Sequence, residues 1–202
     1  MSKRKIISIV VFVFFAVSVC TAVFFASINP LNDDIKDKNY PSEFFCNVGE
    51  NRIDFQTDGN CAAYAAAFVL RDLGEQTSGE EVAPEITRTF GFVAPKSVAR
   101  TLIKHGYTAK AYHGDIDTLR RRLSYGVPII VFVSIPSDTH YAVVAGYDER
   151  YFYLADSLKE NKNAADARYN RKLTTEEFEK IWKTKTILSD NIYIVAGKTR
   201  VV

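Results

Sequence analysis

Several residue types that mark particular protein classes are scarce in this 202-residue chain, which has three cysteines, three histidines, one methionine and one tryptophan. Three cysteines allow at most one disulfide, so the fold must rest on a hydrophobic core, and 47% apolar residues are enough to build one. The chain also lacks low-complexity tracts and internal repeats. These absences exclude repeat architectures and favour one globular domain with an appendage.

An excess of charge of either sign is also missing. Without the three basic residues at positions 3–5, the chain has 23 basic and 24 acidic residues. Because nucleic-acid-binding domains are usually strongly basic, no nucleic acid partner is expected. The one basic run, Arg120-Arg121-Arg122, lies on a predicted helix, where we expect a solvated face.

The first 30 residues form a separate unit. Residues Ile6 to Ala26 are uncharged and predominantly apolar, and the Asn29-Pro30 pair ends the run. A helix needs about 20 such residues to cross the hydrocarbon core of a bilayer. We therefore expect residues 1–30 to be a membrane anchor that contacts the bilayer through residues 6–26.

The charges around this run predict its orientation. Three basic residues precede it, and Asp33 and Asp34 follow it, which places the N-terminus in the cytoplasm and the domain outside. A cleaved secretory signal usually has a shorter apolar region and a cleavage site of small residues, which Phe24-Phe25-Ala26 fits poorly. We favour a membrane-anchored protein with an extracytoplasmic domain over the alternative, a secreted protein.

Residues 31–52 are predicted to be a linker that becomes ordered near Phe44, ahead of a domain that spans residues 53–202. Cys46 lies in this segment. Because Cys20 lies within the apolar run, Cys46 and Cys61 are the one pair available in the soluble part, and cysteines outside the cell can form a disulfide. The sequence leaves open whether they do.

The stretch FQTDGNCAAYAAAFVLRDLG, residues 55–74, predicts a helix with a cysteine at its first position. The Asp58-Gly59-Asn60 segment signals a turn, Asn60 is a good N-cap, and Gly74 suits the left-handed position after the helix. The helix is apolar nearly all round, so it should run through the core. Unpaired backbone N–H groups in its first turn favour the thiolate of Cys61, which is the nucleophilic form.

A thiolate nucleophile needs a base that takes and returns a proton, and histidine suits this at neutral pH. His105 lies at a predicted helix end, where a structural cap is favoured, and His113 lies in a loop where we expect exposure. His140 follows a polar loop and begins the apolar strand HYAVVAGY, at an edge of the predicted sheet. It is the candidate base, and a structural histidine at a strand end is the alternative.

Asp156 is the candidate to orient this imidazole. If three residues form the turn after HYAVVAGY, Tyr147 pairs with Tyr151 and Asp156 falls opposite Ala142. Because side chains alternate between faces, Ala142 and His140 share one face, and the Asp156–His140 diagonal is roughly 7 to 8 Å between backbones. This is within side-chain reach, whereas a two-residue turn would put the aspartate on the other face.

The remaining periodicity predicts helices in the first half of the chain and strands in the second. Helices are expected over residues 61–73, 97–105, 115–125 and 175–182, and strands over 107–112, 129–133, 140–146, 151–155 and 191–196. The predicted fold class is therefore α+β, with helices followed by an antiparallel sheet.

Three stretches in this order, FQTDGNCAAYAAAFVLRDLG, THYAVVAGYDERYFYLADS and LTTEEFEKIW, resemble the C39-like cysteine peptidases, bacterial relatives of the papain-like proteases. The resemblance covers most of residues 53–197. It implies a papain-like fold with a helical N-terminal half that carries the cysteine helix, and an antiparallel sheet that carries the histidine and the aspartate.

The resemblance also implies roles for individual residues: Cys61 as nucleophile, His140 as general base and then acid, Asp156 as the group that orients His140, and Gln56 as a donor to the oxyanion. The interval from Gln56 to Cys61 is five residues, where the family commonly has six, so Asn60 is the alternative donor.

These observations predict a cysteine peptidase that hydrolyses peptide bonds through a Cys-His-Asp triad and a thioester intermediate, on the outer side of the membrane. The expected partners are a peptide or protein substrate and the membrane, with no metal or cofactor. One alternative is a catalytically silent peptide-binding module of the same fold. Others are a transpeptidase or acyltransferase that uses the same thioester, and an enzyme held inactive by a Cys46–Cys61 disulfide.

Overall fold

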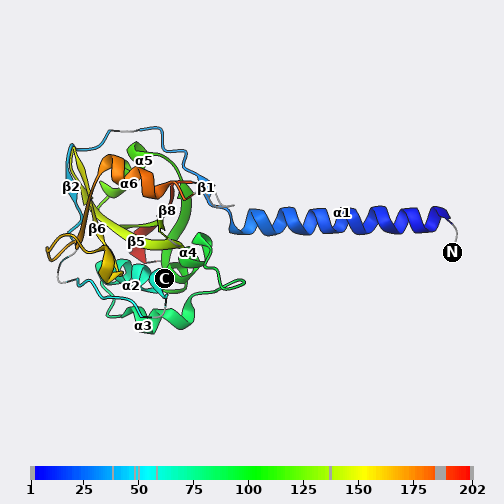
Figure 1. Ribbon diagram of the computed structural model, residues 1–202, viewed down its shortest axis with the longest axis horizontal. Helices are drawn as coiled ribbons and strands as arrows, with labels where there is room; N and C mark the ends of the chain where they lie inside the picture. The colour runs from blue at the N-terminus through cyan, green and yellow to red at the C-terminus, as the bar shows by residue number, and fades with distance from the viewer. Residues whose placement is uncertain are drawn as a thin grey trace.

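An eight-stranded sheet lies between two layers of helices in the computed structural model, which describes residues 3–37, 39–47, 49, 51–57, 59–136, 138–184 and 190–200 (Figure 1). The helices are α1 (Lys3–Ile28), α2 (Cys61–Asp72), α3 (Gly79–Val82), α4 (Pro95–Lys104), α5 (Ile116–Leu123) and α6 (Thr175–Trp182), with short 3₁₀ turns at Ala83–Glu85 and Lys159–Asn161. The strands are β1 (Leu31–Asn32), β2 (Phe44–Phe45), β3 (Tyr107–His113), β4 (Ile129–Ile135), β5 (Asp138–Tyr147), β6 (Tyr151–Ala155), β7 (Arg171–Thr174) and β8 (Ile192–Arg200).

The strand order of the sheet is β1-β3-β8-β4-β5-β6-β7, and β2 pairs with β5 outside this path. All of these neighbours are antiparallel except β1 and β3, which are parallel. Helices α2, α3 and α4 lie on one side of the sheet, and α5 and α6 lie on the other (Figure 1). The predicted α+β class is confirmed, with helices α2 to α5 interrupted by β3.

Helix α2 begins at Cys61, as predicted, and passes through the core. Its residues 62–70 are all buried. The small alanine side chains let the helix backbone approach the sheet closely, and Gly74 at φ +97° follows the end of the helix. Asn60 occupies the N-cap position, but its side chain makes no capping hydrogen bond. The predicted turn includes Asp58, which lies outside the described residues.

Residues 31–52, predicted to be a linker, supply two strands to the sheet. Leu31 and Asn32 pair with the end of β3, and Phe44 and Phe45 pair with the end of β5. Each strand has only two residues, so neither shows the alternation by which strands are recognised in a sequence.

The arginine run on α5 is not a solvated face, so that prediction was wrong. Arg122 binds both carboxylate oxygens of Asp33 at 2.8 and 2.6 Å, and Arg121 forms an ion pair with Asp37 at 3.2 Å. Arg120 lies 5.4 Å from the ring centre of Tyr147. Both aspartates belong to the segment after α1, which folds back onto α5 and so provides partners that lie nearly 90 residues away in the sequence.

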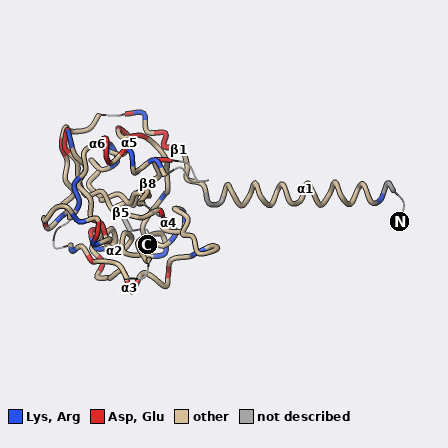
Figure 2. Tube along the Cα trace, viewed as in Figure 1, with Lys and Arg blue, Asp and Glu red and all other residues tan. Residues whose placement is uncertain are grey.

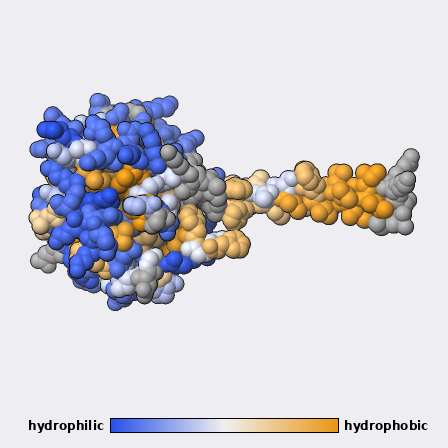
Figure 3. Space-filling model, in the orientation of Figure 1, coloured by the Kyte–Doolittle hydropathy of each residue, from blue (hydrophilic) through white to orange (hydrophobic). Residues whose placement is uncertain are grey.

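Helix α1 projects from the domain (Figure 1). Residues Lys5 to Ala26 are long and apolar enough to cross a membrane, and the described side chains of this stretch are almost all exposed. Figure 2 shows no charge along the helix beyond its N-terminal end, and Figure 3 shows its apolar surface. At the other end, the Lys96 ammonium group on α4 donates a hydrogen bond to the Ala26 carbonyl oxygen at 2.7 Å.

Candidate active site

Cys61 presents a partly exposed thiol at the N-terminus of α2. The first-turn N–H groups of a helix have no intrahelical partners and carry the positive end of its dipole, which favours negative charge at this position. The thiol of Cys61 is free, so the disulfide with Cys46 is absent from the described structure. Cys46 follows β2, is buried, and donates its backbone N–H to the Ala145 carbonyl at 2.9 Å.

His140 is the third residue of β5, and it is 1% exposed. Its Nε2–H donates to Oδ1 of Asp156 at 2.8 Å. Burial of the ring lowers the pKa of His140, but hydrogen bonds with Asp156 and with Cys61 outweigh this effect and raise the pKa to about 9. Because Nε2 is bound to Asp156, Nδ1 is the nitrogen left to exchange a proton with Cys61.

A β-bulge sets the register that brings Asp156 to His140. The predicted pairing of Tyr147 with Tyr151 is wrong, because Tyr147 pairs with Phe152 after a longer turn. The register then shifts by one residue between Val144 and Gly146, so that Val143 pairs with Ala155. The predicted position of Asp156 opposite Ala142 is thereby restored, since the longer turn and the bulge cancel.

Four hydrogen bonds hold the Asp156 carboxylate. Besides His140, Oδ1 accepts the Leu158 backbone N–H at 2.9 Å, and Oδ2 accepts Asn161 Nδ2 and Arg171 Nη1, both at 2.9 Å. Burial raises the pKa of Asp156, but the bonds from His140 and Leu158 and the charge of Arg171 outweigh it, so the net pKa is lowered. The carboxylate therefore stays ionised beside the imidazole.

Asn170 fixes the backbone of Asp156 from the neighbouring loop. Its Oδ1 accepts the Asp156 N–H at 2.8 Å, and its Nδ2 donates to the Asp156 carbonyl at 2.7 Å. Asn170, Asn161 and Arg171 were not among the predicted site residues. Their sequence signal is only proximity to Asp156 within a polar loop, which does not distinguish them from solvated residues.

Gln56 is oriented by the residue that follows Asp156. The Ser157 hydroxyl donates to Oε1 of Gln56 at 2.7 Å, and the Gln56 backbone N–H donates to the Ser157 carbonyl at 2.9 Å. Because Oε1 is occupied, the amide group of Gln56 retains its two N–H donors. The alternative donor, Asn60, is held in a similar way, since its Oδ1 accepts Arg88 Nη2 at 2.7 Å, which likewise leaves its two N–H donors.

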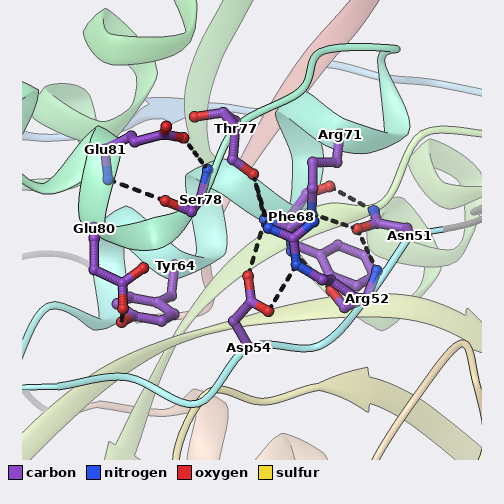
Figure 4. A network of polar contacts seen from close by, with 10 residues as sticks. All are labelled: Asn51, Arg52, Asp54, Tyr64, Phe68, Arg71, Thr77, Ser78, Glu80 and Glu81. Carbon is purple, nitrogen blue, oxygen red and sulfur yellow. Dashed lines mark hydrogen bonds and ion pairs between the residues drawn. The ribbon is translucent and has the colours of Figure 1, made fainter.

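A polar network on α2 holds the segment that leads to Gln56 (Figure 4). The buried Arg71 side chain donates to Oδ1 of Asn51 at 2.8 Å and to the Arg52 carbonyl at 2.7 Å, and it pairs with Asp54 at 3.3 Å. Arg71 also donates to the Thr77 carbonyl at 3.1 Å. The C-terminal end of α2 thus fixes the segment that carries Gln56, while its N-terminal end carries Cys61.

The other two histidines lie outside this arrangement. His105 is the C-cap residue of α4, as predicted, and its ring bridges the carboxylates of Glu75 and Glu85 at 2.7 and 3.1 Å. His113 ends β3, where its carbonyl accepts the Asp33 N–H, and it is half-buried instead of exposed. Within the described ranges, no group of three histidine, cysteine or acidic residues could hold a metal ion.

Comparisons with known proteins agree with this geometry. The model of the Peptidase_C39 like family matches residues 50–187. The peptidase domain of Streptococcus ComA, a bifunctional ABC transporter of a quorum-sensing pathway, has a TM-score of 0.59 at 18% identity, and the match covers 72% of this chain and 97% of that one. Among curated protein sequences, no relative matches this chain.

Two further solved structures share the fold. A double-glycine-motif protease from an AMS/PCAT transporter, solved with its leader peptide, has a TM-score of 0.54 at 19% identity and covers 72% of this chain and 93% of its own. A procathepsin B from Trypanosoma congolense has a TM-score of 0.53 at 12% identity, with coverage of 84% and 82%. The fold therefore extends from the bacterial peptidase domains to the cathepsins.

Proposed function

Because this chain belongs to the Peptidase_C39 like family, we propose that it is a cysteine peptidase that hydrolyses peptide bonds through Cys61, His140 and Asp156. The observation that carries this proposal is the order of thiol, imidazole and carboxylate: the Cys61 side chain acts on His140 and raises its pKa, and His140 is bound to Asp156 at 2.8 Å. A cysteine that serves only in packing has no need of an imidazole next to its thiol.

The roles follow from the chemistry of each group. An imidazolium at His140 favours the thiolate of Cys61, which attacks the carbonyl carbon of the scissile peptide bond. His140 then gives its proton to the leaving amine as the C–N bond breaks, which leaves a thioester on Cys61. Water, deprotonated by His140, hydrolyses the thioester and regenerates the thiol.

Gln56 is the proposed donor to the oxyanion, together with the backbone N–H of Cys61. Each tetrahedral intermediate carries negative charge on the former carbonyl oxygen, and donors fixed in advance stabilise it. The bonds from Ser157 fix the Gln56 amide before substrate arrives. Asn60, whose carbonyl oxygen accepts from Arg88, remains the alternative donor.

We propose that α1 anchors the domain outside the cytoplasmic membrane. Its 22-residue apolar stretch has the length of a bilayer crossing, and the basic residues before it favour a cytoplasmic N-terminus. The proposed substrate class is a peptide or protein; one relative in the same fold binds a leader peptide.

The experiment that tests this function uses the full chain in detergent with a mixture of peptides, followed by mass spectrometry, with Cys61→Ala as the matched control. We expect cleavage products that disappear in the variant. Products joined to an added amine instead of water would identify an acyltransferase. Binding of peptides by both proteins with cleavage by neither would identify the silent module and contradict the proposal.

A further inference from the structure

A short hairpin before α4 displays an aromatic side chain to solvent. The backbones of Thr89 and Phe92 exchange two hydrogen bonds, at 2.8 and 3.0 Å, and Phe90 lies at the tip with its side chain fully exposed. Phe90 has a φ of +51°, a left-handed conformation that bulky residues rarely adopt, and Gly91 follows at +78°. The turn thus holds a large apolar group where the soluble domain gives it nothing to pack against.

This hairpin lies where the chain would leave the bilayer. Ala26 ends the apolar stretch of α1, and its carbonyl accepts the hydrogen bond from Lys96, in the first turn of α4. The hairpin precedes α4 directly. In Figure 1 it extends from the domain on the side from which α1 leaves, and Figure 3 shows apolar surface on this projection.

The composition of the projection suits a membrane interface. Phenylalanine side chains on membrane-surface segments bury at the boundary between head groups and acyl chains, because this removes apolar surface from water. Phe92, 37% exposed, packs its ring against the buried Phe132 and so holds the hairpin to the core, and the basic side chains of Arg88 and Lys96 flank the hairpin in sequence. Such cations complement anionic lipid head groups.

We propose that the Thr89–Phe92 hairpin is a second membrane contact, which inserts Phe90 into the interface of the bilayer that α1 crosses. The proposal rests on the proposed role of α1 as an anchor. One crossing helix leaves a domain free to tilt and rotate, whereas a second contact fixes its orientation.

The orientation matters because the hairpin is joined to the active site. Arg88, at the base of the hairpin, donates to Oδ1 of Asn60, the residue before Cys61. On the other side, the Tyr141 hydroxyl donates to the Val93 carbonyl at 2.8 Å, and Tyr141 follows His140. Insertion of Phe90 therefore holds the nucleophile and its base close to the membrane surface, where peptides bound to the bilayer would reach them.

The test measures how deeply a tryptophan at position 90 lies in the membrane. The full chain with Phe90→Trp is reconstituted into vesicles of phosphatidylcholine and phosphatidylglycerol with brominated acyl chains, which quench tryptophan by contact. Phe14→Trp, in the middle of α1, reports on the anchor, and Phe44→Trp, on β2 at the opposite side of the domain, is the control outside the bilayer (Figure 1). The buried Trp182 gives the background in the wild-type chain.

We expect strong quenching and a blue-shifted emission at positions 14 and 90, with emission at position 44 unchanged. Quenching at position 14 without quenching at position 90 would overturn the hairpin proposal and leave the anchor intact. No quenching at either position would contradict the anchor itself. If the emission at position 90 is the same with and without brominated lipid but changes when peptides are added, the hairpin contacts substrate and not the membrane.

Discussion

At the scale of single residues, the site depends on how His140 is charged. Its raised pKa of about 9 means that between about pH 6.5 and 9 the folded state keeps His140 as the imidazolium, whereas the unfolded chain does not. This difference stabilises the fold fully below the unfolded pKa of 6.5, and the contribution is lost as the pH rises through 9. Since the imidazolium is also the proton donor to the leaving amine, peptidase activity should fall over the same alkaline range.

His140→Ala tests this charge through the reactivity of Cys61. At pH 6 we expect iodoacetamide to alkylate Cys61 much faster in the wild-type chain than in the variant, because the imidazolium favours the thiolate. The two rates should converge as the pH passes about 8.5, where ordinary thiols ionise. Mass spectrometry of the modified peptides gives the rates, and the buried Cys46 serves as internal control. Equal rates at pH 6 would show that no ion pair forms.

Gln56→Ala and Asn60→Ala separate the two candidate oxyanion donors. We expect Gln56→Ala to lower kcat by about 10²- to 10³-fold, the usual effect of losing one such donor. Asn60→Ala removes a partner of Arg88 and should leave kcat within a few-fold of wild type. Steady-state kinetics on a cleaved peptide decide between them, and a larger loss for Asn60→Ala would reverse the assignment.

At the scale of elements, the bulge of β5 and the short strand β2 depend on one another. Gly146 sits at the bulge and pairs with Phe45. A Cβ atom at position 146 would lie 2.4 Å from the Phe45 ring and 2.8 Å from the Phe44 carbonyl oxygen. Only glycine lets β2 lie this close to the strand whose register brings Asp156 to His140.

Gly146→Ala should therefore displace β2 and destabilise the protein by about 1–3 kcal/mol, as overpacking of a core does. Cys46, which follows β2, should become reactive toward iodoacetamide. Urea unfolding and alkylation of the full chain in detergent measure both effects. The control is Glu149→Ala in the exposed turn, with an expected change within about 0.5 kcal/mol. Unchanged stability in Gly146→Ala would show that β2 is dispensable.

At the scale of the whole molecule, the junction between α1 and the domain is fixed by Asp33. Its carboxylate, which is fully buried, binds Arg122 of α5 and accepts the hydroxyl of Tyr193 on β8. Burial raises the pKa of Asp33, but the hydrogen bonds from Arg122 and Tyr193 outweigh it, so the net pKa is lowered. This pair stabilises the fold above pH 3.8, and the contribution is lost as the pH falls below that value.

Asp33→Asn should cost about 3 kcal/mol, because it leaves the charge of Arg122 without its buried partner. Asp37→Asn removes the exposed partner of Arg121 and should cost at most about 1 kcal/mol. Urea unfolding at pH 7 compares the two variants. At pH 3 the cost of Asp33→Asn should shrink, because this pH lies below the unfolded pKa of 3.8 and the contribution of the ionised carboxylate is being lost. A cost that does not change with pH would mean that packing, not charge, holds the junction.

The sequence by itself determined those features that depend on near neighbours. The apolar run of α1, the start of α2 at Cys61 and the strand that carries His140 all follow from composition and periodicity within a few turns or residues. The strand itself, β5, begins two residues before the predicted start, at Asp138. The choice of Asp156 needed only the alternation of side chains along two adjacent strands. The predicted turn was one residue too short, but the bulge shifts the register back by one residue, so the predicted position of Asp156 does not change.

The tertiary structure alone decided the features that join distant segments. Asn170, Asn161 and Arg171 support Asp156, the arginines of α5 bind aspartates nearly 90 residues away, and β1 and β2 complete the sheet from a predicted linker. The physical reason is that a polar side chain in a loop has the same local pattern whether water or a buried carboxylate is its partner. Only the packed chain fixes which of the two it meets.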